Sequence, residues 1–332
     1  MSYNDLTFEM IQNAAQRINS HIIHTPLLKE YALGEELGCD AFCKPEMLQR
    51  TGSFKIRGAL NKILSLSPEQ KKHGIICSSS GNHGKACAYI CQKYHIPAVI
   101  VLPEDTPSEK IDSVRSYSAE VILGPRLYDD RWKMVKKEQE DHGYTIVHAY
   151  EDYEVMAGQG TIGLEIMNDL PDSRPLDAVI VPIGGGGLIS GISTAVKTLS
   201  PSTKIIGVQT EASPGYAVSF KAQKPLETEC LPTLADGITC RKPGIHPFPI
   251  ILDRVDDIVT VGESDIADAV RLIARSTKLI AEPTSSVVVA AVLGGQIKVQ
   301  KDERICFVLT SGNWNIDLLG KLYNKETVPA FL

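Results

Sequence analysis

The sequence lacks the features that mark several large classes of protein. No block of basic residues stands out and the formal net charge is -6, so we expect no nucleic-acid partner. No apolar run approaches the roughly 20 residues that a membrane-spanning helix needs. Residues 1–6 show no basic region followed by an apolar stretch, as a signal peptide would. We therefore expect a cytoplasmic chain that makes no contact with a membrane.

Cysteine is present, but without the spacing of a metal or redox site. None of the eight cysteines belongs to a C-x-x-C pair, and the eight histidines are scattered along the chain. We expect reduced thiols that pack as small apolar side chains. The spacing predicts no metal site.

Short apolar runs alternate with longer helical periodicities along most of the 332 residues. Runs rich in valine and isoleucine predict buried strands at residues 74–78, 98–102, 119–123, 145–148, 178–182, 204–208, 257–261 and 305–309. Helices are expected at residues 53–66, 84–94, 108–117, 129–142, 156–170, 188–199, 263–277 and 284–293.

This alternation predicts an α/β fold with parallel sheets, in which ligands bind at the carboxyl ends of strands. The strands between residues 74 and 148 are numerous enough for a compact lobe of their own. We expect a small domain over residues 73–148, inserted into a large domain formed by residues 1–72 and 149–332. Each would contain a mostly parallel sheet flanked by helices.

Lys55 follows a Gly-Ser turn at the start of an expected helix. The positive end of the helix dipole favours the neutral form of a nearby amine. A neutral amine is the nucleophile that Schiff-base chemistry needs. Taken alone, the segment is equally compatible with an ordinary solvated lysine on a helix turn.

Four consecutive glycines, at residues 184–187, follow the expected strand at residues 178–182 and open a helix. Backbone N–H groups in such a turn can close on an anion, and the helix dipole adds to the attraction. Ile189 and Ser190 stand where a G-x-G-x-x-G dinucleotide motif would require glycine. The loop therefore favours a phosphate monoester, the alternative being a simple tight turn.

Two further loops follow expected strands. Residues 78–84 (SSSGNHG) gather hydroxyls, an amide and backbone donors at a helix start, which suits a carboxylate or, alternatively, a helix cap. Residues 310–313 (TSGN) follow the last expected strand. Arg131 lies between acidic residues on an expected helix, where a solvated face is the ordinary interpretation.

In combination, the motifs resemble those of the tryptophan-synthase-β-like, fold type II enzymes that use pyridoxal 5'-phosphate (PLP). The serine/threonine dehydratases and serine racemases are the most similar branch. The resemblance extends from His24 to Asn313 and depends on residues 53–58 (SFKIRG), 79–83 (SSGNH), 157–161 (AGQGT) and 184–187 (GGGG).

The resemblance implies a role for each residue that would hold PLP. Lys55 would carry the cofactor covalently and later move the substrate's Cα proton. Phe54 and Gly237 would face the pyridine ring from opposite sides, Asn82 would bind the ring hydroxyl, and Thr310 would lie beside the ring nitrogen. The remaining cofactor contacts would come from Gly184, Gly185, Gly186, Gly187, Leu188 and Glu282.

The resemblance also implies the substrate contacts. Ser79, Asn82 and His83 would bind the substrate carboxylate. Ser80 stands where serine racemases place the acid that acts on the opposite face of the substrate. Arg131 fits the racemase pattern too, and an arginine there could instead pair with a second carboxylate.

The implied activity is α,β-elimination from a β-hydroxy-L-amino acid, L-serine or L-threonine by default, to a 2-oxo acid and ammonia. A threo-3-hydroxyaspartate dehydratase and a serine or other amino-acid racemase are the alternatives. The family also implies a homodimer or larger homo-oligomer. From another class, a nucleotide-dependent oxidoreductase would share the alternation and a glycine-rich loop, but a bound PLP would colour the protein yellow.

Overall fold

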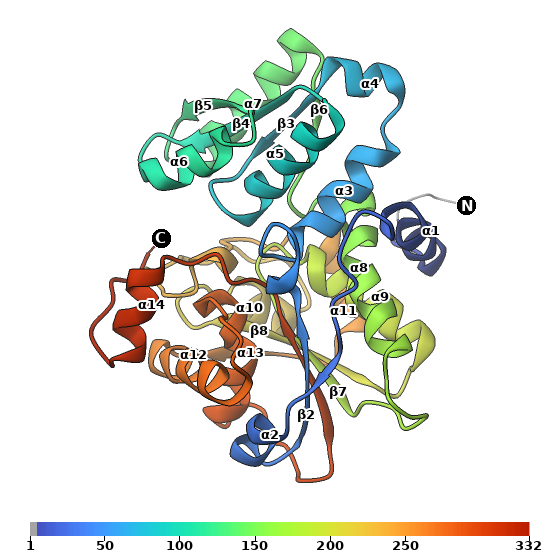
Figure 1. Ribbon diagram of the computed structural model, residues 1–332, viewed down its shortest axis with the longest axis vertical. Coiled ribbons are helices and arrows are strands. Elements are labelled where there is room, and N and C mark those ends of the chain that lie inside the picture. The colour runs from blue at the N-terminus through green and yellow to red at the C-terminus, as the bar shows by residue number, and fades with distance from the viewer. Residues whose placement is uncertain (1–4, 332) are drawn as a thin grey trace.

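The computed structural model describes residues 5–331 and contains two β-sheets flanked by helices (Figure 1). Residues 1–4, on which part of the signal-peptide expectation depends, and residue 332 lie outside the described range. The strands are β1 (Leu28–Lys29), β2 (Asp40–Pro45), β3 (Ile75–Ser78), β4 (Ala98–Pro103), β5 (Glu120–Gly124), β6 (Thr145–Ile146), β7 (Ala178–Pro182), β8 (Lys204–Thr210), β9 (Asp257–Val261) and β10 (Arg304–Leu309).

The helices cover most of the remaining chain. They are α1 (Phe8–Ile18), α2 (Tyr31–Leu37), α3 (Lys55–Ser65), α4 (Pro68–His73), α5 (Asn82–Tyr94), α6 (Ser108–Arg115), α7 (Tyr128–His142), α8 (Tyr153–Asn168), α9 (Gly187–Leu199), α10 (Gly215–Ala222), α11 (Pro247–Arg254), α12 (Glu263–Thr277), α13 (Pro283–Leu293) and α14 (Ile316–Tyr323), with short 3₁₀ turns η1 (Glu46–Leu48) and η2 (Asp236–Ile238).

The larger sheet has the strand order β1-β2-β10-β7-β8-β9. Every neighbouring pair in it is parallel except β1 and β2, which are antiparallel. Strands β7 and β10 are buried along their whole length, because apolar side chains point to both faces and helices cover both. The predicted α/β fold is confirmed, and the larger sheet is mostly parallel, with one antiparallel pair at its edge.

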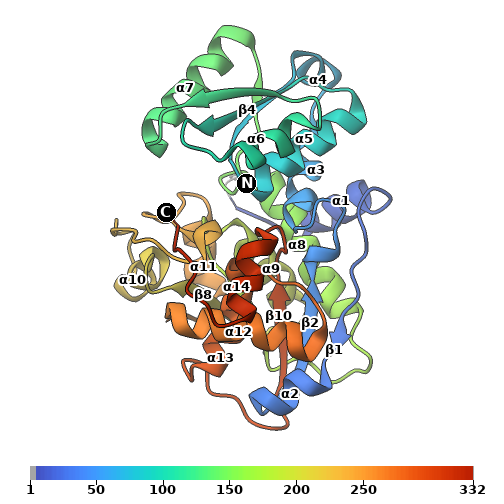
Figure 2. The same ribbon diagram turned by 60° about the vertical axis from the view of Figure 1, so that its left-hand side comes forward.

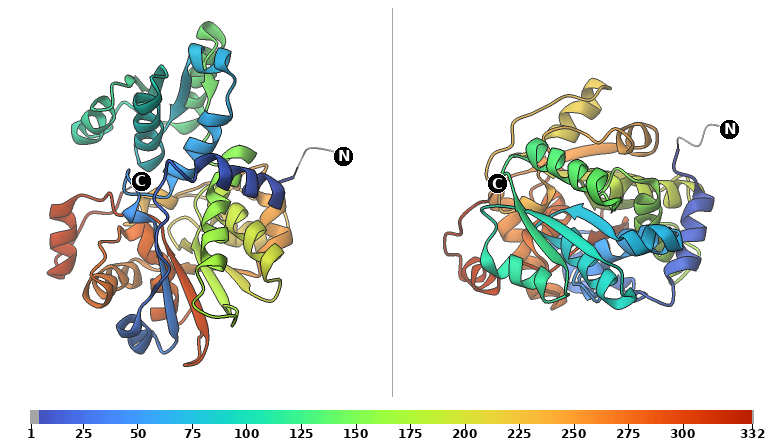
Figure 3. Two further views of the ribbon diagram at one scale, coloured as in Figure 1. Left: turned by 45° about the vertical axis from the view of Figure 1, so that its right-hand side comes forward. Right: turned by 90° about the horizontal axis from the view of Figure 1, so that it is seen from above.

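The smaller sheet has the order β5-β4-β3-β6 and is parallel throughout. One face packs against α7, through Val135, and the other against α5 and α6 (Figure 3). Helix α3 contributes Ile56 and Leu60 to the apolar core between the smaller sheet and helices α5 and α6. It does so although it precedes residue 73, the expected start of the small domain. Figure 2 shows the smaller sheet and its helices above the larger part of the molecule. The domain boundaries at residues 73 and 148 stay a prediction.

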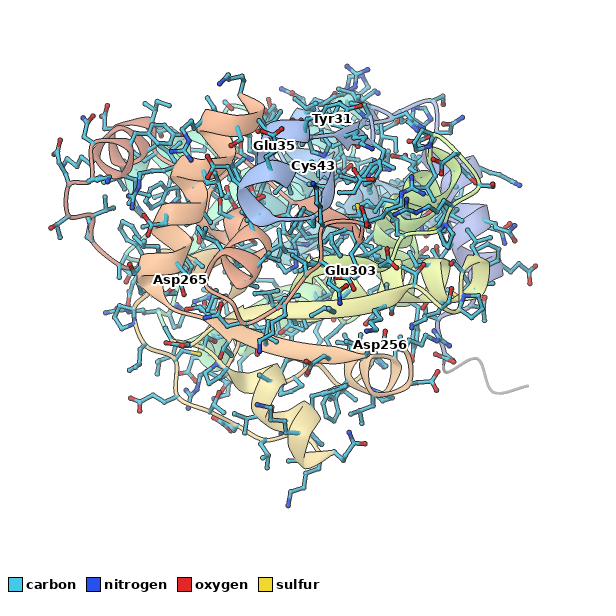
Figure 4. All side chains as sticks on the ribbon, turned by 90° about the horizontal axis from the view of Figure 1, so that it is seen from below. Tyr31, Glu35, Cys43, Asp256, Asp265 and Glu303 are labelled. Atoms are coloured by element: carbon cyan, nitrogen blue, oxygen red, sulfur yellow. The ribbon has the colours of Figure 1, made fainter. Side chains whose placement is uncertain are left out.

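The carboxyl ends of the larger sheet's parallel strands, β2, β10, β7, β8 and β9, face the smaller sheet (Figure 1). Because β2, β10 and β7 are neighbours, the segments that follow them lie side by side. Glu303 and Asp256 immediately precede β10 and β9, and so mark the opposite, amino end of the strands (Figure 4). The edge that faces the smaller sheet is where a parallel sheet binds ligands.

Within residues 5–331, no helix is long and apolar enough to cross a membrane. All eight cysteines are unpaired, and six of them are buried. The expected packing of thiols as small apolar side chains is therefore confirmed for those six.

Candidate active site

Lys55 is the first residue of α3, in the segment that follows β2. Two contacts fix this segment against the loop after β10. The Phe54 N–H donates to the Thr310 carbonyl at 3.0 Å, and Ser53 forms an antiparallel bridge with Ser311. The predicted cofactor residues Phe54, Lys55 and Thr310 are thus brought together by backbone pairing.

The Lys55 amine is turned inward. Its Nζ donates to the Ala149 carbonyl at 3.1 Å and lies 5.1 Å from the centre of the Phe54 ring. Burial of the amine disfavours the charged form and lowers the pKa of Lys55 to about 8. The neutral form of this lysine is therefore far more populated near physiological pH than that of an exposed lysine, which favours nucleophilic catalysis.

The glycine loop joins β7 to α9 and approaches its neighbours too closely for side chains. A Cβ on Gly185 would lie 2.1 Å from the Tyr150 ring, and one on Gly186 would lie 2.3 Å from the Tyr216 hydroxyl. Gly186 also has a φ of 92°, a conformation that favours glycine. The loop presents bare backbone at the start of α9, where unpaired N–H groups attract anions.

The first turn of α9 and the 3₁₀ turn η2 complete this corner of the site. Leu188 is buried directly after the glycines. A Cβ on Gly184 would lie 3.4 Å from the Gly237 carbonyl, so the two glycines are adjacent. The Gly237 N–H donates to the Thr284 hydroxyl at 3.1 Å, which fixes η2 against α13.

Glu282 lies immediately before α13 and accepts three hydrogen bonds, which come from two other segments. Its donors are the Ser311 hydroxyl at 2.5 Å, the Asn313 N–H at 2.9 Å and the Asn82 amide at 3.1 Å. Burial raises the pKa of Glu282 despite these donors. This carboxyl connects the start of α5, beside the smaller sheet, to the loop after β10.

The loop from β3 to α5 contains Ser79 and Ser80, both half-buried. The Ser79 hydroxyl accepts from the Gly81 N–H at 3.3 Å. The His83 ring is buried, with Nε2 at 2.8 Å from the Val147 carbonyl. Since that nitrogen is paired with the backbone, the first turn of α5 offers an anion its backbone N–H groups and the Asn82 amide.

Arg131 lies on α7, beside the carboxyl end of β3. Its Nε donates to the Ser78 hydroxyl at 3.0 Å, and its Nη1 donates to the carbonyls of Pro125 at 2.9 Å and Arg126 at 2.8 Å. The guanidinium thereby fixes the chain before α7 to the end of β3. Burial lowers the pKa of Arg131.

Two polar side chains that the sequence did not single out join the site. The Asn313 amide donates to the Thr51 carbonyl and to Asn82 Oδ1, both at 2.7 Å. His148 Nδ1 accepts from the Glu151 N–H at 2.9 Å, and burial lowers the pKa of His148 to about 3. Asn313 could have been found from the sequence, because it ends the TSGN loop that follows an expected strand. His148 only marks the end of an expected strand, so nothing in the sequence indicated its role.

An inward lysine amine and a glycine loop with bare backbone at a helix start are what an enzyme of the fold type II class needs to hold PLP. The chain belongs to this class, because residues 18–311 match the family described as "Pyridoxal-phosphate dependent enzyme". It is 42% identical over 325 residues to the L-threonine ammonia-lyase of Thermotoga maritima, a match covering 98% of this chain and 80% of that relative.

Solved structures agree with the fold. The threonine deaminase of T.th. superposes with a TM-score of 0.87 at 38% identity, covering 93% of this chain and 99% of the other. The serine racemase of Dictyostelium discoideum gives a TM-score of 0.87 at 34% identity, with the same two coverages. The predicted family is therefore confirmed, and the oxidoreductase alternative is excluded.

Proposed function

We propose that the protein is a PLP-dependent ammonia-lyase that converts a β-hydroxy-L-amino acid, L-threonine or L-serine, to a 2-oxo acid and ammonia. The inward amine of Lys55, with its pKa lowered to about 8, is the observation that carries the proposal. The similarity to an L-threonine ammonia-lyase and to a threonine deaminase supports the choice of substrate.

The residues present fit PLP. The glycine loop leaves no room for side chains but offers backbone donors, which suits the phosphate. When bound, PLP withdraws electrons from the substrate and so acidifies its Cα proton. The residues that we propose to hold it are Phe54, Lys55, Asn82, Gly184, Gly185, Gly186, Gly187, Leu188, Gly237, Glu282 and Thr310.

Lys55 is the proposed base. Its neutral Nζ takes the proton from Cα, and the resulting ammonium can donate to the Ala149 carbonyl that the amine already contacts. The hydrogen bond to Ala149 also fixes the position of Nζ, so the proton moves to one defined atom. Loss of the β-hydroxyl then gives an enamine that hydrolyses to the 2-oxo acid and ammonia.

The substrate carboxylate has a proposed place at the start of α5. Ser79 and Asn82 supply polar side chains, and His83 supplies its backbone N–H while its Nε2 stays at the Val147 carbonyl. The helix dipole favours an anion at this end. Helix α5 packs against the smaller sheet, so we propose that residues 73–148 act as a domain that positions the substrate for Lys55.

Racemisation is the second candidate activity, favoured by the half-buried Ser80 and by the similarity to a serine racemase. Ser80 would return a proton to the opposite face of Cα. A dehydratase for threo-3-hydroxyaspartate would need Arg131 as a clamp for the second carboxylate. Three hydrogen bonds already commit Arg131 to Ser78 and to two carbonyls, which favours serine and threonine over the acidic substrate.

A substrate panel tests the proposal. We expect purified holoenzyme to release 2-oxo acid from L-threonine and L-serine with a kcat/KM at least about tenfold higher than from L-threo-3-hydroxyaspartate. The ratio is modest because only Arg131 would have to leave its present partners to bind the second carboxylate. Chiral chromatography of the remaining amino acid measures racemisation in the same samples. Preference for hydroxyaspartate would contradict the role assigned to Arg131, and D-serine without 2-oxo acid would establish the racemase instead.

The pH dependence of turnover provides a separate test. Burial lowers the pKa of Lys55 to about 8, and only the neutral amine removes a proton. We therefore expect kcat to rise with pH through about pH 8 and to level off above it. Initial rates with saturating substrate, measured from about pH 6 to pH 10, give the profile. A kcat that is flat across this interval would rule out a neutral lysine as the base.

We further propose a cytoplasmic homodimer or larger homo-oligomer. The unpaired state of all eight cysteines supports a reducing compartment. Light scattering coupled to size-exclusion chromatography would give the oligomeric state.

A further inference from the structure

Three buried side chains that the proposed reaction does not use lie close together on β3 and α5. Cys77 is in β3, and His83 and Cys87 are one turn apart on α5. Each is at most 2% exposed. Each offers one ligand atom, and these atoms all lie within 4.8 Å of one another. The set combines two sulfurs with an imidazole, the ligands that soft divalent cations prefer.

The three side chains need to move only slightly to share one ion, because their ligand atoms already lie within 4.8 Å of one another. Bond lengths of about 2.3 Å for Zn–S and about 2.0–2.1 Å for Zn–N at a tetrahedral angle place two such ligands about 3.5 Å apart. Three protein ligands also leave a fourth position of the tetrahedron for water or another donor.

The imidazole of His83 provides a second, independent observation. Its Nε2 lies 2.8 Å from the Val147 carbonyl, whereas its Nδ1 is buried and has no hydrogen-bond partner among the described residues. A buried polar atom without a partner is costly. A histidine that ligates a metal through one nitrogen and donates from the other to a backbone carbonyl is a common arrangement.

We propose that Cys77, His83 and Cys87 form a binding site for one soft divalent cation such as Zn²⁺, and that occupation of this site inhibits the enzyme. Residues 78–82, the loop that we assign to the substrate carboxylate, lie between the first two ligands. Drawing Cys77 and His83 onto one ion would change the shape of that loop. Binding of the cation does not depend on the proposed function of the protein, whereas inhibition by the cation rests on that function.

Binding of the cation must release protons. Both ligating thiols lose theirs to solvent, while the neutral imidazole keeps one proton on its other nitrogen, so two protons leave for each ion bound. Burial raises the pKa of Cys87 well above its usual range. Protons therefore compete with the cation for the two sulfurs, and binding should strengthen as the pH rises.

Cadmium is the probe of choice, because its thiolate complexes absorb in the ultraviolet. Titration of the holoenzyme with Cd²⁺ should give a charge-transfer band that saturates at one equivalent, with a parallel loss of 2-oxo acid production. In Cys77→Ala and Cys87→Ala, removal of a direct ligand should weaken binding by more than about 100-fold, beyond the 10–100-fold typical of outer-shell changes. Cys91→Ala, on the same helix and equally buried, should bind as the wild type does.

Several results would overturn the site. These are the absence of a thiolate band in the wild type, wild-type titration by either cluster variant, or loss of binding in Cys91→Ala. If a variant does not fold, X-ray absorption at the zinc edge of wild-type holoenzyme with one equivalent of Zn²⁺ decides the matter. Two sulfur neighbours and at least one nitrogen neighbour support the site, and a shell without sulfur refutes it. A protein that binds Cd²⁺ but turns over no amino acid would keep the site and refute only the proposed function.

Discussion

Lys55→Ala should abolish turnover, with kcat/KM falling by at least about 10⁴-fold, the upper range for loss of a positioned base. The variant loses both the covalent attachment of PLP and the base that removes the Cα proton. The glycine cradle at residues 184–187 is unchanged, so the variant should still bind PLP through its phosphate. Release of 2-oxo acid measures turnover, and equilibrium dialysis measures retention of PLP.

Lys62→Ala is a matched control, because Lys62 lies on the same helix and pairs with Asp152 at 2.6 Å rather than facing the site. Its activity should stay within a few-fold of the wild type. Normal turnover by Lys55→Ala would refute the assigned mechanism. Equal losses in both variants would show that α3 itself had been disrupted.

Arg57→Met should cause the largest loss of stability among single substitutions near the site. Arg57 is fully buried and joins Glu46 and Glu165 through hydrogen bonds of 2.6–2.8 Å. Its removal leaves two carboxylates in the interior with one buried cation, Lys44, at 2.6 Å from Glu165. Breaking a buried ion pair from one side costs about 3–5 kcal/mol.

This loss should appear in thermal unfolding of the protein without added substrate. With an entropy of unfolding of about 2.1 cal/mol/K per residue, the midpoint should fall by about 4–7 °C. Arg241→Met provides the control, because Arg241 and Glu227 form an exposed ion pair at 2.8 Å, of the kind that contributes about 0–1 kcal/mol. Equal midpoints for the two variants would show that the buried network contributes no more than a surface pair.

The sequence was most informative where local pattern decides the structure. All eight expected strands and all eight expected helices occur, with ends displaced by at most three residues. The glycine loop could be anticipated because backbone geometry alone restricts residues 184–187. Lys55 could be placed at a helix start because a Gly-Ser turn precedes it. Family resemblance then supplied the cofactor and the reaction, which periodicity cannot.

The sequence was least informative where tertiary contacts override local character. Strand β2 was missed because Lys44 and Pro45 interrupt its apolar run, and Lys44 is nevertheless fully buried through its ion pair with Glu165. The partners of Asn313 come from segments more than 200 residues away. The cluster of Cys77, His83 and Cys87 escaped notice because its ligands are divided between a strand and a helix.

The pairing of β2 with β10 determines when the site can form during synthesis on the ribosome. Strand β2 comprises residues 40–45 and its parallel partner residues 304–309, whereas every strand of the smaller sheet lies within residues 75–146. A nascent chain can therefore complete the smaller sheet while β2 still lacks a neighbour on one side. Lys55 emerges early, but the Thr310 carbonyl that fixes its loop emerges only with β10, so productive capture of PLP must await the synthesis of β10.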